Sequence, residues 1–193
     1  MARITDTSRI ESMEEAAMAL VVDRGYAGTS VLEIAKRAGV SAGYLYSHYK
    51  SKEDLVLSVY EKNIGVFDEF IDLTISTSAS VSEFARLFVR YMFLKAGEFP
   101  SVVRFLLLLV FDQTFNLPAM RRDKTREQCK RILMKGVETG EIDRKYTPED
   151  VYIVYFSIPF KLLEHRLENS TNPRSITEGD IERVSEMCVK ALR

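Results

Sequence analysis

The chain has 193 residues with 27 lysines and arginines against 28 aspartates and glutamates, which gives a net charge of −1 at pH 7. This length suits one large domain or two small ones with a real core, and the near-zero charge argues against a protein that binds polyanions over its whole surface. The charge is faintly uneven, because residues 1–52 hold seven basic and six acidic side chains while residues 53–193 hold 20 and 22.

Helical periodicity dominates the first half of the chain, and no convincing alternating pattern of a β-strand appears. Four helices are predicted there, and the second and third are short. Their boundaries follow from glycine stops, serine caps and one capping box, at Gly25, at Ser30 with Glu33, at Gly39, at Ser41 and at Ser51. The fourth helix is expected over 52–72, and the serine- and threonine-rich residues 74–80 are expected to form a loop.

Five longer and more apolar helices are predicted in the second half. They are expected from 81 to about 97, over 102–111, from 118 to 139, after Thr147 and after Thr177. Each of the two threonines opens a capping box, which Asp150 and Asp180 close. Pro159 lies within the helix that follows Thr147 and is expected to kink it.

The cysteines and the apolar segments favour a cytoplasmic protein. Cys129 and Cys188 lie far apart without metal-ligand neighbours, which favours two packed free thiols in a reducing compartment. The apolar run 105–111 is much shorter than the roughly 20 residues of a membrane span, so a buried helix is expected. The polar N-terminus predicts no signal peptide. The only histidines, His48 and His165, are well separated, so no metal site is expected.

The two short helices around Gly39 have the layout of a helix-turn-helix unit, whose second helix enters the major groove of DNA. Small residues at the start of that helix allow its backbone to approach base edges. The hydroxyls and cationic groups that follow are suited to phosphate oxygens, and such contacts position a protein while contacts with base edges specify the sequence. The faint positive charge of residues 1–52 agrees with a DNA-binding module.

At several of these positions, packing in the core or simple exposure to solvent is an alternative to DNA contact. Leu45 is expected in the core, and Tyr49 is expected to pack inward while Tyr46 faces out. Tyr44 is evenly balanced between contacting a base and facing solvent. His48 taken alone would more often be an ordinary surface histidine, but next to these neighbours the phosphate role is favoured.

Residues 10–56 resemble the N-terminal domain of the TetR/AcrR family of bacterial transcriptional regulators. The resemblance rests on three segments, 25–30, 34–41 and 45–55. Their residue types and the spacing between them match the family without an insertion or a deletion. It implies phosphate contacts for Thr29, Tyr46, His48 and Lys52, and base contacts for Ala42, Gly43 and Tyr44. Because Ala42 and Gly43 offer little hydrogen-bonding chemistry, base reading is expected to depend on Tyr44, Ser41 and Ser47 and on the shape of the DNA. The full set of expected DNA-binding residues is Thr29, Ser30, Ser41, Ala42, Gly43, Tyr44, Tyr46, Ser47, His48 and Lys52.

The resemblance also implies the fold and the division into domains. The fold class is all-α, with about nine helices. An N-terminal three-helix helix-turn-helix domain over 1–52 is expected to be linked through the helix 53–73 to a helical regulatory, ligand-binding and dimerisation domain over 74–193.

The implied function is that of a ligand-responsive repressor, which binds a palindromic operator as a homodimer and is released by a small hydrophobic effector. The alternative is a helix-turn-helix regulator without a small ligand, controlled by a protein partner. An enzyme is not expected, because no nucleophile–base pair, phosphate loop or metal spacing stands out, and no cofactor is implied. The protein is expected at the nucleoid.

The resemblance further implies a ligand pocket among the fifth to eighth helices and a dimer interface on the helices after Thr147 and Thr177, where apolar and aromatic side chains are the candidates. The ligand-binding candidates, for which plain core packing is the competing role, are Phe88, Met92, Arg104, Phe105, Leu108, Phe111, Gln113, Tyr152 and Tyr155. Arg104 and Asp112 flank an apolar helix, either as its solvated ends or as groups that orient a polar part of a ligand. The dimerisation candidates are Tyr152, Phe156, Leu163, Leu167, Val184, Met187 and Leu192.

Overall fold

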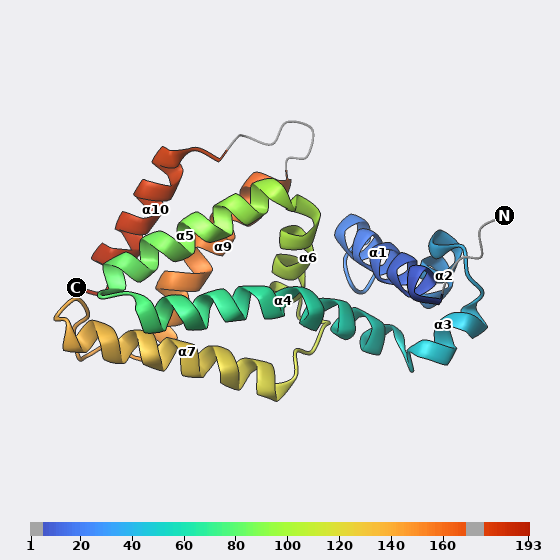
Figure 1. The fold of residues 1–193 in the computed structure, drawn as a ribbon, viewed down its shortest axis with the longest axis horizontal. Helices are drawn as coiled ribbons and strands as arrows, with labels where there is room; N and C mark the ends of the chain where they lie inside the picture. Colours follow the sequence, from blue (N-terminus) through green and yellow to red (C-terminus); the bar gives the residue numbers. More distant parts are fainter. Residues whose placement is uncertain (1–5, 169–175) are drawn as a thin grey trace. The chain divides into compact units, whose positions relative to one another are not determined.

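A computed structural model describes residues 6–168 and 176–193, and all regular structure in these ranges is helical (Figure 1). The helices are α1 (Asp6–Arg24), α2 (Val31–Ala38), α3 (Ala42–His48), α4 (Lys52–Thr77), α5 (Val81–Glu98), α6 (Pro100–Phe111), α7 (Ala119–Glu138), α8 (Pro148–Val151), the π-helix η1 (Tyr152–Ser157), α9 (Ile158–Glu168) and α10 (Glu178–Ala191). Since α8, η1 and α9 follow one another without a break, the described residues form nine helical runs. The predicted all-α fold is confirmed.

The chain divides into two compact units. One comprises Met1–Gly65 and Ser101–Leu117, and the other comprises Val66–Pro100 and Pro118–Arg193. The helix α4 contributes to both units. Residues of α6 group with the N-terminal helices, a grouping that the proposed division into 1–52, 53–73 and 74–193 does not include.

The N-terminal helices are fixed by the predicted caps and stops. The Ser30 and Ser41 hydroxyls accept hydrogen bonds from the backbone N–H groups three residues on, at Glu33 and Tyr44. Gly39 ends α2 with a φ of 69°, a left-handed conformation that glycine adopts without strain. Apolar side chains of α1, α2 and α3 are fully buried, including Met13, Ala17, Ile34 and Leu45.

The second unit is held by aromatic and aliphatic packing between α5, η1, α9 and α10. The Phe88 ring lies 5.1 Å from that of Phe156, and both residues are buried. The Cys188 thiol, also buried, donates to the Val154 carbonyl oxygen at 3.2 Å. Cys129 and Cys188 are free thiols, as predicted, and burial raises the pKa of each to about 12. Buried neutral thiols of this kind are chemically inert.

The predicted loop over 74–80 is wrong in extent, because α4 continues to Thr77 and only residues 78–80 separate it from α5. The Thr74 and Thr77 hydroxyls donate to the carbonyl oxygens of Phe70 and Leu73, one turn earlier. Thr74 is also 4% exposed, so it packs as part of a helix face. The hydroxyls are therefore satisfied inside the helix, which composition alone did not indicate.

The predicted disturbance at Pro159 takes the form of a π-helix. Pro159 has no N–H to donate and its ring would press on the carbonyl four residues earlier. In the structure the preceding turn is wider, and the Ile158 N–H donates to the carbonyl of Ile153, five residues back. The wider turn accommodates the proline ring and its missing N–H group. Val154, Tyr155 and Phe156 are buried in this turn.

Candidate nucleic-acid interface

The helix α3 has one inward face and one outward face, as a recognition helix requires. Leu45 is completely buried, and Tyr49, which follows α3, is 9% exposed and donates from its hydroxyl to Glu14 at 3.3 Å. Tyr46 is 55% exposed. The predicted inward packing of Leu45 and Tyr49 and the outward position of Tyr46 are confirmed, and Ser41, Gly43 and Ser47 are exposed as well.

Two residues of α1 join the outward face of α3 in a polar cluster. The Tyr44 hydroxyl donates to the Asp6 carboxylate, and His48 Nε2 lies 3.9 Å from the same carboxylate. The Tyr44 and His48 rings are 4.8 Å apart, and the Arg9 guanidinium lies 5.4 Å from the centre of the Tyr44 ring. No pattern in the sequence links Asp6 and Arg9 to the recognition helix, because they precede its first residue, Ala42, by 36 and 33 positions.

An open cavity of about 350 Å³ lies beside this cluster, between the start of α1 and the turn that joins α2 to α3. It is lined by Ser8, Arg9, Ser12, Ala38, Gly39, Val40, Ser41 and Tyr44. Its lining combines hydroxyls, a guanidinium and backbone near Gly39. Such groups can accommodate a DNA phosphate.

Lys52, at the start of α4, forms hydrogen bonds with the turn between α1 and α2. Its ammonium donates to the carbonyl oxygens of Tyr26 at 2.8 Å and Thr29 at 3.0 Å, and it lies 4.0 Å from the centre of the Tyr26 ring. The Tyr26 ring also packs against Phe115, which is 4% exposed and whose ring centre lies 4.9 Å from that of Tyr26. The ammonium therefore has a structural role in addition to the expected phosphate contact, and one of its three donors is left over.

The hydroxyls expected at the start of α2 serve the local fold. Thr29 is 3% exposed, and its hydroxyl donates to the Gly25 carbonyl oxygen at 2.9 Å. The Ser30 hydroxyl caps α2 and donates to the Glu33 carboxylate at 2.7 Å. The Ser30 hydroxyl thus caps α2, while the buried Thr29 hydroxyl is satisfied within the turn that precedes it.

Ligand-binding candidates of the second unit are mainly core residues. Phe88, Met92 and Tyr155 are at most 5% exposed, while Tyr152 is partly exposed. Phe88 packs among aromatic rings of η1 and α9.

The ligand-binding candidates on α6 and in the loop after it differ in their exposure to solvent. Phe105 is completely buried, Leu108 and Phe111 are partly exposed, and Gln113 is exposed. Arg104 is partly exposed, yet its Nε atom is buried without a hydrogen-bond partner. Among the described residues, Ser78 Oγ is the one other buried side-chain polar atom in this condition. A buried guanidinium nitrogen without a hydrogen-bond partner costs free energy.

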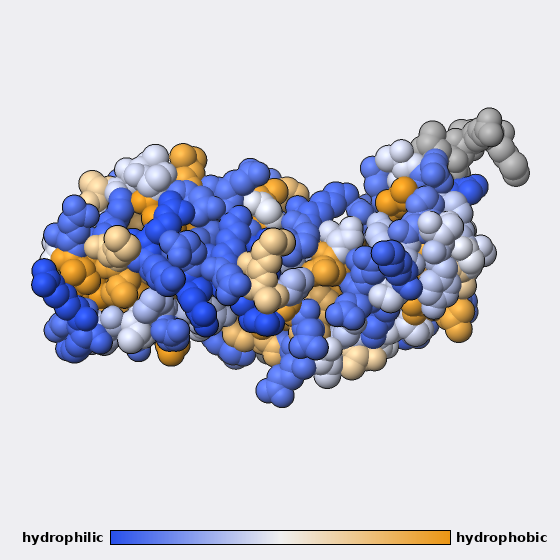
Figure 2. Space-filling view, turned by 90° about the horizontal axis from the view of Figure 1, so that it is seen from below, coloured by the Kyte–Doolittle hydropathy of each residue, from blue (hydrophilic) through white to orange (hydrophobic). Residues whose placement is uncertain are grey.

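The dimerisation candidates divide by exposure. Phe156, Leu163, Val184 and Leu192 are at most 3% exposed within one chain, so they belong to its core. Tyr152 and Leu167 are partly exposed, and Met187 is 50% exposed. The face in Figure 2 is mostly hydrophilic, with hydrophobic residues in separate patches, and scattered apolar residues of this kind are normal on a surface.

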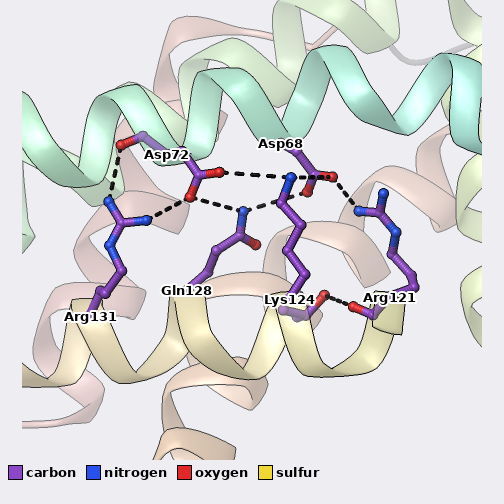
Figure 3. A network of polar contacts seen from close by, with 7 residues as sticks. Asp68, Asp72, Arg121, Lys124, Gln128 and Arg131 are labelled. Atoms are coloured by element: carbon purple, nitrogen blue, oxygen red, sulfur yellow. Dashed lines mark hydrogen bonds and ion pairs between the residues drawn. The ribbon is translucent and has the colours of Figure 1, made fainter. Parts of the chain in front are cut away.

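The sequence reasoning missed a polar network between α4 and α7 (Figure 3). Asp68, which is 4% exposed, receives hydrogen bonds or ion pairs from Arg121, Lys124 and Gln128. Asp72, one turn later on α4, is bound by Arg131 at 2.7 Å and by Gln128 at 3.4 Å. The signal was present, since α7 carries seven basic residues against three acidic ones and two aspartates stand four residues apart on α4.

In residues 6–168 and 176–193, none of the helices has both the length and the apolar character needed to cross a membrane. The same residues hold no group of three or more histidines, cysteines, aspartates or glutamates placed to bind a metal ion.

Known proteins share this architecture and its N-terminal motif. The family described as "Bacterial regulatory proteins, tetR family" matches residues 15–59. The fatty acid metabolism regulator protein of Bacillus subtilis (strain 168) is 31% identical over 136 residues, which cover 66% of this chain and 68% of that protein.

Two solved structures extend the likeness to nearly the whole chain. The transcriptional regulator FadR from Bacillus subtilis in complex with stearoyl-CoA superposes with a TM-score of 0.70 at 23% identity, covering 95% of this chain and 99% of that one. AibR in complex with isovaleryl coenzyme A and operator DNA gives a TM-score of 0.68 at 22% identity, covering 95% and 97%. The helix-turn-helix geometry and these likenesses agree, and the chain belongs to the TetR family of bacterial regulatory proteins.

Proposed function

We propose that this protein is a transcriptional repressor that binds a palindromic operator as a homodimer and is released by a long-chain fatty acyl-CoA. The observation that carries operator binding is α3, with Leu45 buried on one side and Tyr46, Ser47 and His48 exposed on the other. A two-fold dimer would present two such helices to half-sites roughly 34–36 Å apart.

Selection of genomic DNA fragments by the purified protein, repeated at two salt concentrations, tests operator binding. A palindromic site enriched near a few promoters is expected. Uniform, salt-sensitive recovery without a shared site would mean that only phosphate contacts operate, and it would contradict the proposal.

The assignment of an acyl-CoA effector rests on relatives together with Arg104. One relative is named a fatty acid metabolism regulator, and two similar structures contain acyl-CoA esters. Such an ester combines an apolar chain with a thioester carbonyl and phosphates. Arg104 follows the buried Val103 and precedes the buried Phe105, and its Nε lacks a partner. This guanidinium is suited to a carbonyl or phosphate oxygen of the ester.

Thermal unfolding with stearoyl-CoA, with stearate and with coenzyme A tests the effector. A ligand at 100 times its dissociation constant stabilises a protein by about 2.7 kcal/mol, so the ester should raise Tm while its two halves raise it less. Arg104→Ala should lose most of the shift, and Arg86→Ala, the same change at an exposed position of α5, should keep it. Absence of a shift with any lipid ester would favour control by a protein partner.

The dimer is proposed to use the exposed side of α10, around Met187. Met187→Arg should convert the dimer to a monomer in sedimentation experiments and weaken operator binding, since a charge in an apolar interface is costly. Met134→Arg on α7, where the methionine is 71% exposed, is the matched control and should leave the dimer intact. A dimer that survives Met187→Arg would place the interface elsewhere.

A further inference from the structure

The cluster formed by Asp6, Arg9, Tyr44 and His48 determines how Tyr44 can bond to DNA. A phenol has one hydrogen to donate and two lone pairs that accept. The Asp6 carboxylate can only accept, so the bond between the two residues uses the single hydrogen of Tyr44. What Tyr44 has left for a partner outside the protein is acceptor capacity.

We propose that Asp6 makes Tyr44 a hydrogen-bond acceptor toward DNA, so that Tyr44 reads an exocyclic amino group of adenine or cytosine in the major groove. This inference rests on the proposed operator binding and adds a specificity-determining residue, Asp6, from outside the recognition helix.

The chemistry of the major groove determines which strand of a base pair Tyr44 can bond to, because each pair presents one amino donor, on adenine or on cytosine. Adenine N6 and cytosine N4 are its hydrogen-bond donors, whereas guanine N7 and O6, thymine O4 and the phosphates are acceptors. A Tyr44 oxygen without a free hydrogen cannot bond to any of these acceptors. Tyr44 lies in the first turn of α3, the part of a recognition helix that contacts base edges.

Neighbouring groups hold the arrangement in place. The His48 ring packs 4.8 Å from the Tyr44 ring, and the Arg9 guanidinium lies 5.4 Å from its centre. Arg9 also offsets the charge of Asp6, which would otherwise repel nearby phosphates. The bond to Asp6 raises the pKa of Tyr44, with Arg9 acting in the opposite direction, so the phenol stays neutral.

Selection from a randomised duplex library, followed by affinity measurements on the selected site and its single-base variants, tests the inference. On the contacted strand, the wild-type protein should prefer adenine or cytosine over thymine or guanine at one position of each half-site by about fivefold, the value of an ordinary hydrogen bond. In Asp6→Ala, Tyr44 regains a free hydrogen and the preference should fall to about twofold or less. Tyr44→Phe should flatten the same position.

Two further variants separate base reading from charge and from folding. Glu11→Ala removes the same charge from an exposed position of α1 and should leave the base preference unchanged. The double variant of Asp6→Ala and Tyr44→Phe should lose no more discrimination than Tyr44→Phe alone, because both changes remove one interaction. Thermal melts of all four variants show whether each is folded.

The outcomes distinguish this inference from the proposed function. A wild-type site with a base preference that survives Asp6→Ala would overturn the role of Asp6 and leave operator binding intact. Loss of an adenine or cytosine preference in both single variants, with Glu11→Ala unchanged, would support it. Failure of the wild-type protein to enrich any site would overturn operator binding and this inference together.

Discussion

Two residues expected to contact phosphate, Tyr46 and Lys52, differ in what they do for the folded protein. Tyr46 is 55% exposed, while the Lys52 ammonium donates to two carbonyl oxygens of the turn between α1 and α2. Loss of a contact made only with DNA weakens binding without changing stability. Loss of an ammonium that satisfies part-buried carbonyls affects both.

Tyr46→Phe should therefore weaken binding to all DNA sequences alike and leave Tm unchanged. Lys52→Ala should weaken binding to a similar degree and also destabilise the fold by about 1–3 kcal/mol, the cost of unsatisfied polar groups. Fluorescence anisotropy on specific and random duplexes, together with urea unfolding, measures both quantities. A change in sequence preference without weaker binding would contradict the assigned phosphate role.

Asp180 makes a pH-dependent contribution to stability. Hydrogen bonding to Thr177, with Arg166 and Arg183 as nearby cations, lowers the pKa of this carboxyl below its ordinary value of 3.8. Because the pKa is lower in the folded state, the contribution is complete above 3.8 and is lost as the pH falls through the folded value.

Asp180→Asn should therefore be less stable than the wild-type protein by a constant amount between about pH 5 and 7, and the difference should shrink below pH 4. Urea unfolding at a series of pH values measures this difference. A difference that grows as the pH falls would mean that the carboxyl is not stabilised in its charged form.

At the scale of helices, the polar bridge between α4 and α7 depends on Asp68 being paired. The Asp68 side chain is 5% exposed and that of its partner Arg121 is 10% exposed. Removing one member of a buried pair leaves the other charge uncompensated, at a cost of about 3–5 kcal/mol.

Arg121→Ala should thus destabilise the protein by several times more than Lys130→Ala, a change of the same charge at an exposed position of the same helix. Chemical denaturation gives both values. The double variant Arg121→Ala with Asp68→Asn should recover part of the loss, since the buried charge is then gone. Equal losses in the two single variants would show that the pair is not buried in solution.

Helix boundaries were predictable where a residue acts locally. The capping boxes at Thr147 and Thr177 and the stop at Gly39 depend on side chains within three residues of the helix end, and the structure contains all of them. The end of α4 was not predictable, because Thr74 and Thr77 bond inside a helix whose continuation depends on packing. Pro159 predicted a disturbance of its helix, but the sequence near the proline did not indicate that a π-helix would form over Tyr152–Ser157.

In the candidate site, too, local features could be predicted from the sequence and contacts between distant residues could not. The exposed and buried positions of α3 could be derived from its own short sequence. The contact of Tyr44 with Asp6 joins residues 38 positions apart, and that of Lys52 with Tyr26 joins residues 26 apart. Such pairings are fixed by the tertiary fold. The buried Nε of Arg104 likewise becomes visible only when the fold is known.

At the scale of the whole molecule, the proposed regulation is a coupling between effector binding and operator binding. A ligand shifts the protein away from the DNA-binding state only if it prefers the other state. The helix α4 runs through both compact units, from Lys52 in the DNA-binding part to Thr77, and we propose that it transmits this preference. By reciprocity, DNA must weaken effector binding by the same factor.

The affinity of the dimer for its selected operator, measured with and without saturating stearoyl-CoA, is the decisive test of this coupling. The ester should weaken operator binding by about 5- to 150-fold, the usual range of allosteric coupling. Stearate and coenzyme A, each added alone, should have smaller effects. Equal operator affinity in the presence and absence of the ester, at concentrations where it is shown to bind, would contradict the account.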